Sequence, residues 1–146
     1  MGKLLAERRD ITREQLERTI RLMDSAVPDC LVVDFEELLG GIELPDPNDR
    51  HVLAAAIKAD ADAIITFNLK DFPESALRKY GIEAQHPDEF ICCQYDLKPA
   101  VVVIAAQRCR QRLKNPPKTA VEYLTTLERQ GLPKTVDLLS EFASIL

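Results

Sequence analysis

The first third of the chain carries one clear helical pattern, followed by a short apolar run. Residues 12–26 place Leu16, Ile20 and Met23 on one side of a helix, and Thr12 with Gln15 has the spacing of a capping box. We therefore predict an amphipathic helix at residues 12–26. The short apolar run at residues 30–33 predicts a strand, and residues 36–39 predict a helical turn that ends at two glycines.

Helix and strand patterns then alternate. Residues 49–60 predict a helix with an alanine-rich apolar face, for which Asn48 or Asp49 is the candidate N-cap. The apolar and partly β-branched residues 63–67 predict a buried parallel strand. Further along the chain we expect a loop, a helix, a second strand and another helix, at residues 68–72, 73–80, 82–84 and 87–94. This order predicts an α/β fold, in which a partial parallel sheet is flanked by helices.

From Pro99 onward the strand signals stop. The remaining sequence predicts three helices separated by proline-containing turns, at residues 99–115, 119–130 and 133–145. We therefore expect a boundary near residue 96, with an α/β domain at 1–96 and a C-terminal helical extension at 97–146.

Composition narrows the class of protein. The 146 residues are 46% hydrophobic and 29% charged, as in an ordinary globular domain, and no apolar stretch reaches the roughly 20 residues that span a bilayer. We expect a cytoplasmic protein without a membrane partner. The net charge of −5 argues against nucleic-acid binding through bulk charge, although acidic residues gathered in one site would leave room for a local basic face. The four cysteines form no C-x-x-C pair and are expected to be free thiols.

Four oxygen-bearing side chains are predicted to meet at one edge of the sheet: Asp46, Asp49, Asn68 and Asp71. The helix from Asp49 and the returning strand each span roughly 18 Å, so the chain comes back to the same edge. Grouped carboxylates repel one another, and oxygen ligands favour Mg²⁺ or Mn²⁺ over zinc. Taken alone, Asp49 is better explained as an N-cap and Asp71 as a loop aspartate, so the residues by themselves favour these structural alternatives over a metal site.

Basic residues near these acids offer contacts for a phosphate. Arg50 and Lys70 adjoin the acidic positions and are the candidates to hold substrate phosphates. A second basic set lies on and after the first C-terminal helix, where a solvated helix end is the favoured interpretation: Arg108, Arg110, Arg112, Lys114 and Lys118. His51 is interpreted as a helix residue that hydrogen-bonds near the N-terminus of its helix.

Several motifs resemble the second half of a PIN domain, in particular the branch that contains VapC-type ribonuclease toxins. The motifs are PDPNDRHVLAAA from Pro45, ITFNLKDFP from Ile65, HPDEF from His86 and RLKNPP from Arg112. The resemblance implies that Asp49, Asn68 and Asp71 bind a catalytic Mg²⁺ or Mn²⁺ with support from Asp46. It also implies an endoribonuclease that cleaves RNA, with a VapB-like antitoxin as partner.

One part of the PIN pattern has no counterpart in the sequence. PIN domains begin with a strand that carries an aspartate, soon followed by a glutamate on a helix, and we match neither to a residue of this chain. We therefore predict that the N-terminal part of the domain is missing, and that a second copy or a partner restores the sheet. The alternative function is a non-catalytic PIN remnant that serves as a dimerisation or antitoxin-binding module.

Overall fold

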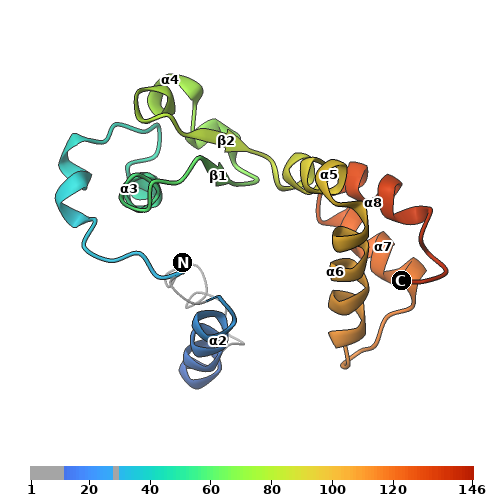
Figure 1. Ribbon diagram of the computed structural model, residues 1–146. Coiled ribbons are helices and arrows are strands. Elements are labelled where there is room, and N and C mark those ends of the chain that lie inside the picture. The colour runs from blue at the N-terminus through green and yellow to red at the C-terminus, as the bar shows by residue number, and fades with distance from the viewer. Residues whose placement is uncertain (1–11, 28–29) are drawn as a thin grey trace.

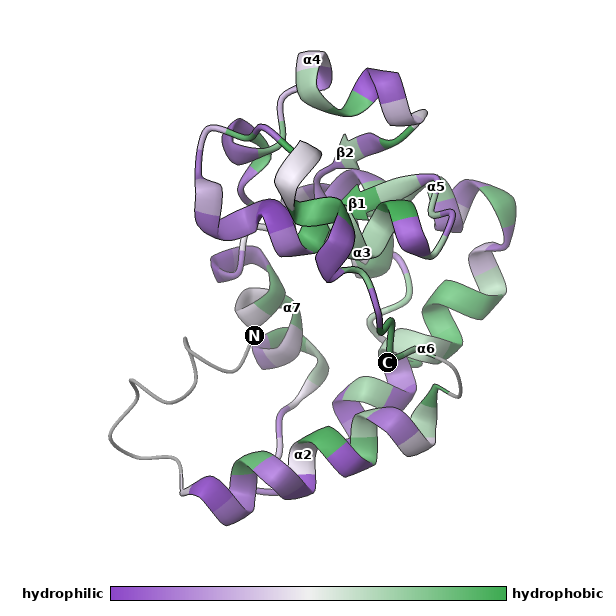
Figure 2. Cartoon of the chain, turned by 90° about the vertical axis from the view of Figure 1, so that its left-hand side faces the viewer, coloured by the Kyte–Doolittle hydropathy of each residue, from purple (hydrophilic) through white to green (hydrophobic). Residues whose placement is uncertain are grey.

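The computed structural model describes residues 12–27 and 30–146 (Figure 1). Helix α2 spans Arg13–Ala26 and confirms the first predicted helix. It begins at a capping box in which Thr12 Oγ1 accepts the Gln15 N–H at 3.2 Å and Gln15 Oε1 accepts the Thr12 N–H at 2.9 Å. Hydrophobic and hydrophilic residues alternate along it (Figure 2). No residue of α2 is buried, so its apolar stripe has no packing partner among the described residues.

The strand predicted at residues 30–33 does not form. These residues have no regular structure, and the Leu31 side chain is 71% exposed. A strand exists only through hydrogen bonds to a neighbour, and the described part of the chain offers none at this position. The helical turn that follows is confirmed as a 3₁₀ helix, η1, at Glu36–Gly41.

The centre of the first half is a parallel sheet of two strands. Strand β1 spans Ala63–Ile65 and pairs with β2 at Glu83–Gln85, with Ala63 opposite Glu83 and Ile65 opposite Gln85. The chain leaves β1 through η3 at Leu69–Asp71 and reaches β2 through α4 at Glu74–Leu77 and η4 at Arg78–Tyr80. The predicted α/β class is thus confirmed, with a smaller sheet and more helix than a full parallel sheet would give.

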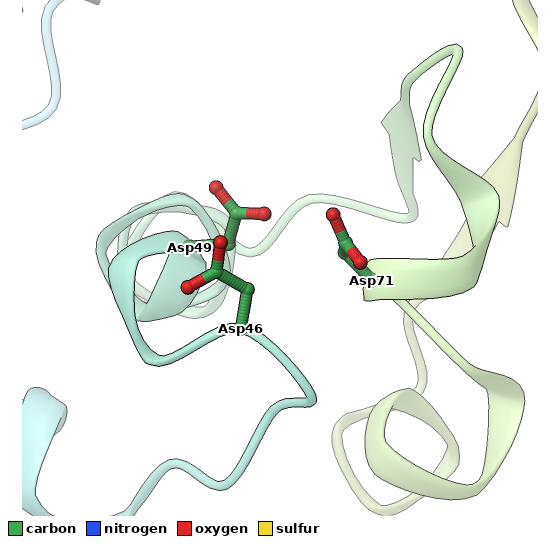
Figure 3. A group of neighbouring side chains, drawn as sticks. All are labelled: Asp46, Asp49 and Asp71. Carbon is green, nitrogen blue, oxygen red and sulfur yellow. The ribbon is translucent and has the colours of Figure 1, made fainter.

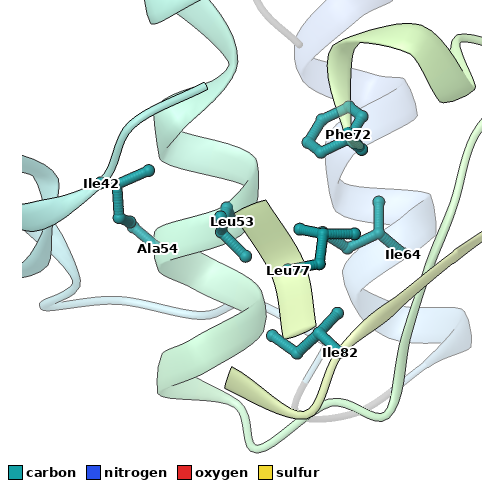
Figure 4. Close-up of a cluster of buried hydrophobic side chains, with 7 residues drawn as sticks. All are labelled: Ile42, Leu53, Ala54, Ile64, Phe72, Leu77 and Ile82. Carbon is teal, nitrogen blue, oxygen red and sulfur yellow. The ribbon is translucent and has the colours of Figure 1, made fainter. Parts of the chain in front are cut away.

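Helix α3, at Arg50–Lys58, packs on this sheet through a buried hydrophobic cluster (Figure 4). Leu53 and Ala54 of α3 are fully buried. The rest of the first cluster comes from the residue after η1, from β1 and from the segment between the strands: Ile42, Ile64, Phe72, Leu77 and Ile82. This cluster fixes α3 against β1, and therefore fixes the start of α3 beside the loop that leaves β1.

The second half is helical, as predicted. It consists of α5 at Pro87–Leu97, α6 at Pro99–Arg112, α7 at Ala120–Arg129 and α8 at Pro133–Ser140. A second hydrophobic cluster holds these helices together and shares no residue with the first: Val103, Ala106, Tyr123, Leu124, Leu139 and Leu146. In the described part of the chain, every helix is too short or too polar to cross a membrane.

A buried carboxylate joins α5 to α8. Asp88, only 3% exposed, accepts hydrogen bonds from the Lys134 N–H at 3.0 Å, the Thr135 N–H at 2.8 Å and the Thr135 hydroxyl at 2.7 Å. Burial acts to raise the pKa of the Asp88 carboxyl, but these hydrogen bonds outweigh it and hold the pKa below its ordinary value. Asp88 therefore links α5 to the C-terminal helices. The domain boundary predicted near residue 96 stays a prediction.

Candidate metal centre

Asp46 opens the short 3₁₀ helix η2, at Pro47–Asp49. Its Oδ1 accepts two hydrogen bonds from Asn48, one from the backbone N–H at 2.8 Å and one from the side-chain Nδ2 at 2.9 Å. The sequence fits this turn because an aspartate often accepts the N–H two residues later. Asp46 is half-buried, and its carboxylate is held in one orientation by its neighbour in the loop.

Asp49 stands at the N-cap position of α3, but its side chain makes no capping hydrogen bond. Its backbone is already helical, with φ −89° and ψ −1°, whereas a capping side chain needs an extended backbone. Asp49 is therefore the N-cap residue by position, as predicted, but its side chain does not cap the helix. The half-buried carboxylate stays available for another partner.

Asp71 ends η3, in the segment that leaves the carboxyl end of β1, where the sequence predicts it to reach the site. Its Oδ2 accepts a hydrogen bond from the side-chain Nδ2 of Asn68. Asn68 is exposed, and its backbone N–H donates to Thr66 Oγ1 at 3.0 Å. Asn68 therefore lies beside Asp71, at the place that the sequence predicts.

Asp46, Asp49 and Asp71 converge in space, and we call them the acidic trio. Each offers a carboxylate oxygen, and these oxygens all lie within 4.8 Å of one another. Figure 3 shows Asp46 and Asp49 at the start of α3 and Asp71 facing them from the segment after β1. The ion pairs found in the described residues, Arg13–Glu17 and Lys134–Glu89, leave all three carboxylates unneutralised.

The donor set of the acidic trio fits a hard divalent cation. Three half-buried carboxylates without a cationic partner repel one another, and a divalent ion relieves that repulsion. Oxygen ligands on opposite sides of Mg²⁺ lie about 4.2 Å apart, so little side-chain movement brings this trio into range. Carboxylates alone favour Mg²⁺ or Mn²⁺, because zinc sites in proteins draw mainly on nitrogen and sulfur ligands.

The basic residues near the trio differ in their surroundings. Arg50 is half-buried, and its Nε is buried without a hydrogen-bond partner among the described residues. Lys70 is exposed. His51 Nδ1 lies 2.7 Å from the carbonyl oxygen of Asn48. Because a carbonyl only accepts, Nδ1 carries a proton and donates it, as expected for a residue near a helix N-terminus.

Part of the basic set of α6 serves the fold. Arg110 donates from Nε to the Leu146 carbonyl at 2.6 Å and from a terminal nitrogen to the Lys118 carbonyl at 2.7 Å. Lys118 Nζ donates to Thr126 Oγ1 at 2.7 Å. These two residues tie α6 to α7 and to the last residues. This leaves Arg108, Arg112 and Lys114 exposed to solvent.

Comparison with known proteins gives matches in both halves of the chain. A family model described as a PIN domain matches residues 3–70, and a model described as the VapC50 C-terminal domain matches residues 87–141. The chain is a PIN-domain protein related to VapC50. A Mycobacterium tuberculosis protein with the printed name "Putative ribonuclease VapC50" is 57% identical over 49 residues, which is 34% of this chain and 29% of that protein. No solved structure matches the chain significantly.

The extent of these matches bears on the sequence predictions. The aligned segment spans less than a third of the length of the VapC50 relative. The PIN-domain match starts at residue 3, so it gives no clear sign that the N-terminal part of the domain is missing. That expectation stays a prediction. The PIN match includes Asp46, Asp49 and Asn68 and stops one residue before Asp71, which the geometry adds to the site.

Sequence reasoning missed the role of Asn48, which it considered only as a helix cap. The structure shows both of its N–H groups on Asp46. The Asp-Pro-Asn order was the available signal, because proline fixes the turn in which an aspartate accepts the N–H of the second residue after it.

Proposed function

We propose that this PIN-domain protein is a metal-dependent endoribonuclease that hydrolyses RNA phosphodiesters, as the toxin of a toxin–antitoxin pair or as a portion of one. The observation that carries the proposal is the convergence of the acidic trio within 4.8 Å from two separate segments of the chain. The relation to a protein named as a ribonuclease supports the choice of RNA.

The chain's own groups divide the work as follows. Asp49 and Asp71 face each other across the site and would hold Mg²⁺ or Mn²⁺ from both sides, with Asp46 as the third carboxylate. A bound divalent cation supplies charge neutralisation of the phosphodiester and lowers the pKa of coordinated water. The carboxylates hold the cation in place, and their half-buried setting limits the competition from bulk water.

Arg50 and Lys70 are proposed to hold the phosphates of the substrate. Arg50 follows Asp49 directly and carries a buried donor, Nε, that has no partner in the described part of the chain. A buried donor without a partner costs about 1–3 kcal/mol, which a phosphate oxygen would recover. Lys70 is exposed beside Asp71 and would act as a mobile charge.

The test is RNA cleavage with Mn²⁺, compared with the same reaction in EDTA. We expect the unmodified chain to cleave RNA. Loss of an outer-shell partner lowers the activity of a metal site about 10- to 100-fold, and we expect Asp49→Ala or Asp71→Ala to lower RNA cleavage by more than that. Asp137→Ala removes an exposed carboxylate of α8 and is the matched control. Cleavage that survives EDTA, or that survives the loss of Asp49 and Asp71, would contradict the proposal.

The alternative is a PIN remnant that serves as a dimerisation or antitoxin-binding module. Exposed apolar side chains on α2 and after it favour such contacts: Ile20, Leu22, Met23, Val27, Leu31 and Val33.

We propose homo-oligomerisation, and a VapB-like antitoxin as the protein partner, because the chain is related to VapC50. Mn²⁺ binding without RNA cleavage would favour the module. A monomer in light scattering would contradict homo-oligomerisation.

A further inference from the structure

Two asparagines each hold one aspartate of the acidic trio. Asn48 donates to Asp46 Oδ1 from its side-chain Nδ2 at 2.9 Å, and Asn68 donates to Asp71 Oδ2 from its side-chain Nδ2. Among the described residues, Asp49 has no amide of this kind. The hydrogen bonds therefore divide the trio into two carboxylates that are held and one that is free.

Chemistry fixes the orientation of both amides. An ionised carboxylate has only acceptor atoms, so each asparagine must turn its NH₂ group, and not its oxygen, toward the aspartate. The side-chain nitrogen of Asn68 therefore points to Asp71, and the amide oxygen lies on the other side of the planar amide group. The same argument holds for Asn48 and Asp46.

Each asparagine is itself anchored by neighbouring groups. The Asn68 backbone N–H donates to Thr66 Oγ1 at 3.0 Å, and the Asn68 carbonyl accepts the Asp71 N–H at 3.2 Å. The Asn48 carbonyl accepts a hydrogen bond from His51 Nδ1 at 2.7 Å. These contacts set the position of both amides before any cation is present. This is how outer-shell groups orient the ligands of a metal site.

We propose that Asn48 and Asn68 are positioning residues of the metal site, each through the NH₂ group that it donates to one aspartate of the trio. Each amide engages one oxygen of its aspartate and leaves the other, Oδ2 of Asp46 and Oδ1 of Asp71, for the cation. This inference rests on the proposed function, because it requires a divalent cation at the trio.

The two asparagines are expected to differ in importance. Asn48→Ala keeps the backbone N–H bond to Asp46 Oδ1, at 2.8 Å. Asn68→Ala removes the side-chain hydrogen bond that Asp71 receives in the described part of the chain. By isothermal titration with Mn²⁺ we expect Asn68→Ala to weaken binding about 10-fold or more, and Asn48→Ala to weaken it by less. Gln111→Ala, which removes an exposed amide from α6, is the matched control and should leave the affinity unchanged.

Nuclear magnetic resonance can test whether the hydrogen bond from Asn68 to Asp71 persists when the cation binds. The side-chain amide protons of Asn68 are assigned as the pair that disappears in Asn68→Ala. Without metal they should resonate downfield, as protons hydrogen-bonded to a carboxylate do, and they should stay there when Mg²⁺ saturates the site. Movement of this pair to the position of a free amide would mean that the NH₂ group has left Asp71, and it would overturn the positioning role of Asn68.

The outcomes for the inference and for the proposed function can be told apart. If Asp49→Ala and Asp71→Ala bind Mn²⁺ as well as the unmodified chain, the trio is not a metal site and the proposed function fails with it. If those two variants lose binding while Asn48→Ala and Asn68→Ala retain full affinity, the metal site stands and the positioning role is wrong. Circular dichroism of each variant checks that the helices are intact.

Discussion

At the scale of single residues, Asp88 shows how one buried carboxylate stabilises a helix junction. Two of its three hydrogen bonds satisfy the N–H groups of Lys134 and Thr135 in the first turn of α8, which would otherwise have no partner, and the third comes from the Thr135 hydroxyl. Asp88→Asn replaces one acceptor oxygen by an NH₂ group, which would face an N–H donor of α8 and could not accept a hydrogen bond from it. We expect it to reduce the free energy of unfolding by about 1.5–3 kcal/mol at neutral pH, measured by urea unfolding. Asp96→Asn, an exposed aspartate of the same helix, should have little effect.

The lowered pKa of Asp88 also predicts a pH dependence. The folded state binds a proton on this carboxyl more weakly than the unfolded state does. The stabilisation is therefore complete above pH 3.8, which is the ordinary pKa of the group. It is lost as the pH falls from there through the folded-state pKa. The stability difference between the unmodified chain and Asp88→Asn should therefore shrink in this acidic range. A difference that stays constant at all pH values would show that the charge of Asp88 contributes nothing.

Contacts of this kind were beyond sequence analysis. Asp88 and Thr135 are 47 positions apart in the chain, and no periodic pattern connects them. The acidic trio was accessible, because a helix and a returning strand of similar length bring Asp49 and Asp71 to one edge. The direction in which each side chain points was not accessible, and so the hydrogen bond from the Asn68 side-chain nitrogen to Asp71 was not predicted. The prediction of Asn68 as a metal ligand stays a prediction.

At the scale of elements, α3 joins the core to the acidic trio. Leu53 is fully buried one turn after Asp49, and it anchors α3 against the sheet. Leu53→Ala should lower the free energy of unfolding by about 2–5 kcal/mol, because it leaves a cavity in the first cluster. It should also weaken Mn²⁺ binding, since the start of α3 loses its anchor. Val121→Ala, at a position 70% exposed on α7, is the control for both measurements. Unchanged Mn²⁺ affinity in Leu53→Ala would show that the loop alone positions Asp49.

Helices were predicted more accurately than strands, and the reason is physical. A helix closes its hydrogen bonds locally, so the capping box at Thr12 and the periodic apolar residues after it define α2 almost to the residue. A strand depends on a neighbour that the local sequence does not reveal. Residues 30–33 have strand-like side chains but no paired neighbour in the described chain, and β1 is shorter than the predicted run at 63–67.

At the scale of the whole molecule, few side chains connect the two hydrophobic clusters. Phe67, just after β1, lies edge-on to His86 with ring centroids 5.1 Å apart. Gly131 adopts φ +85°, and a side-chain carbon at that position would lie 3.6 Å from the Phe67 ring. Phe67 is nevertheless 59% exposed, so this contact buries little apolar surface. The two halves of the chain therefore have separate cores with a small contact between them.

Separate cores predict separate local unfolding, which hydrogen exchange can resolve. Leu77 lies in the first cluster and Leu139 in the second, and their exposed fractions of 0% and 1% make them a matched pair. Leu77→Ala should reduce amide protection in α3, β1 and β2 while α7 and α8 keep theirs, and Leu139→Ala should do the reverse. The reason is that each cavity destabilises only the cooperative unit that contains it. If either variant reduced protection equally in both halves, the chain would unfold as a single unit, and Phe67 would be a coupling contact.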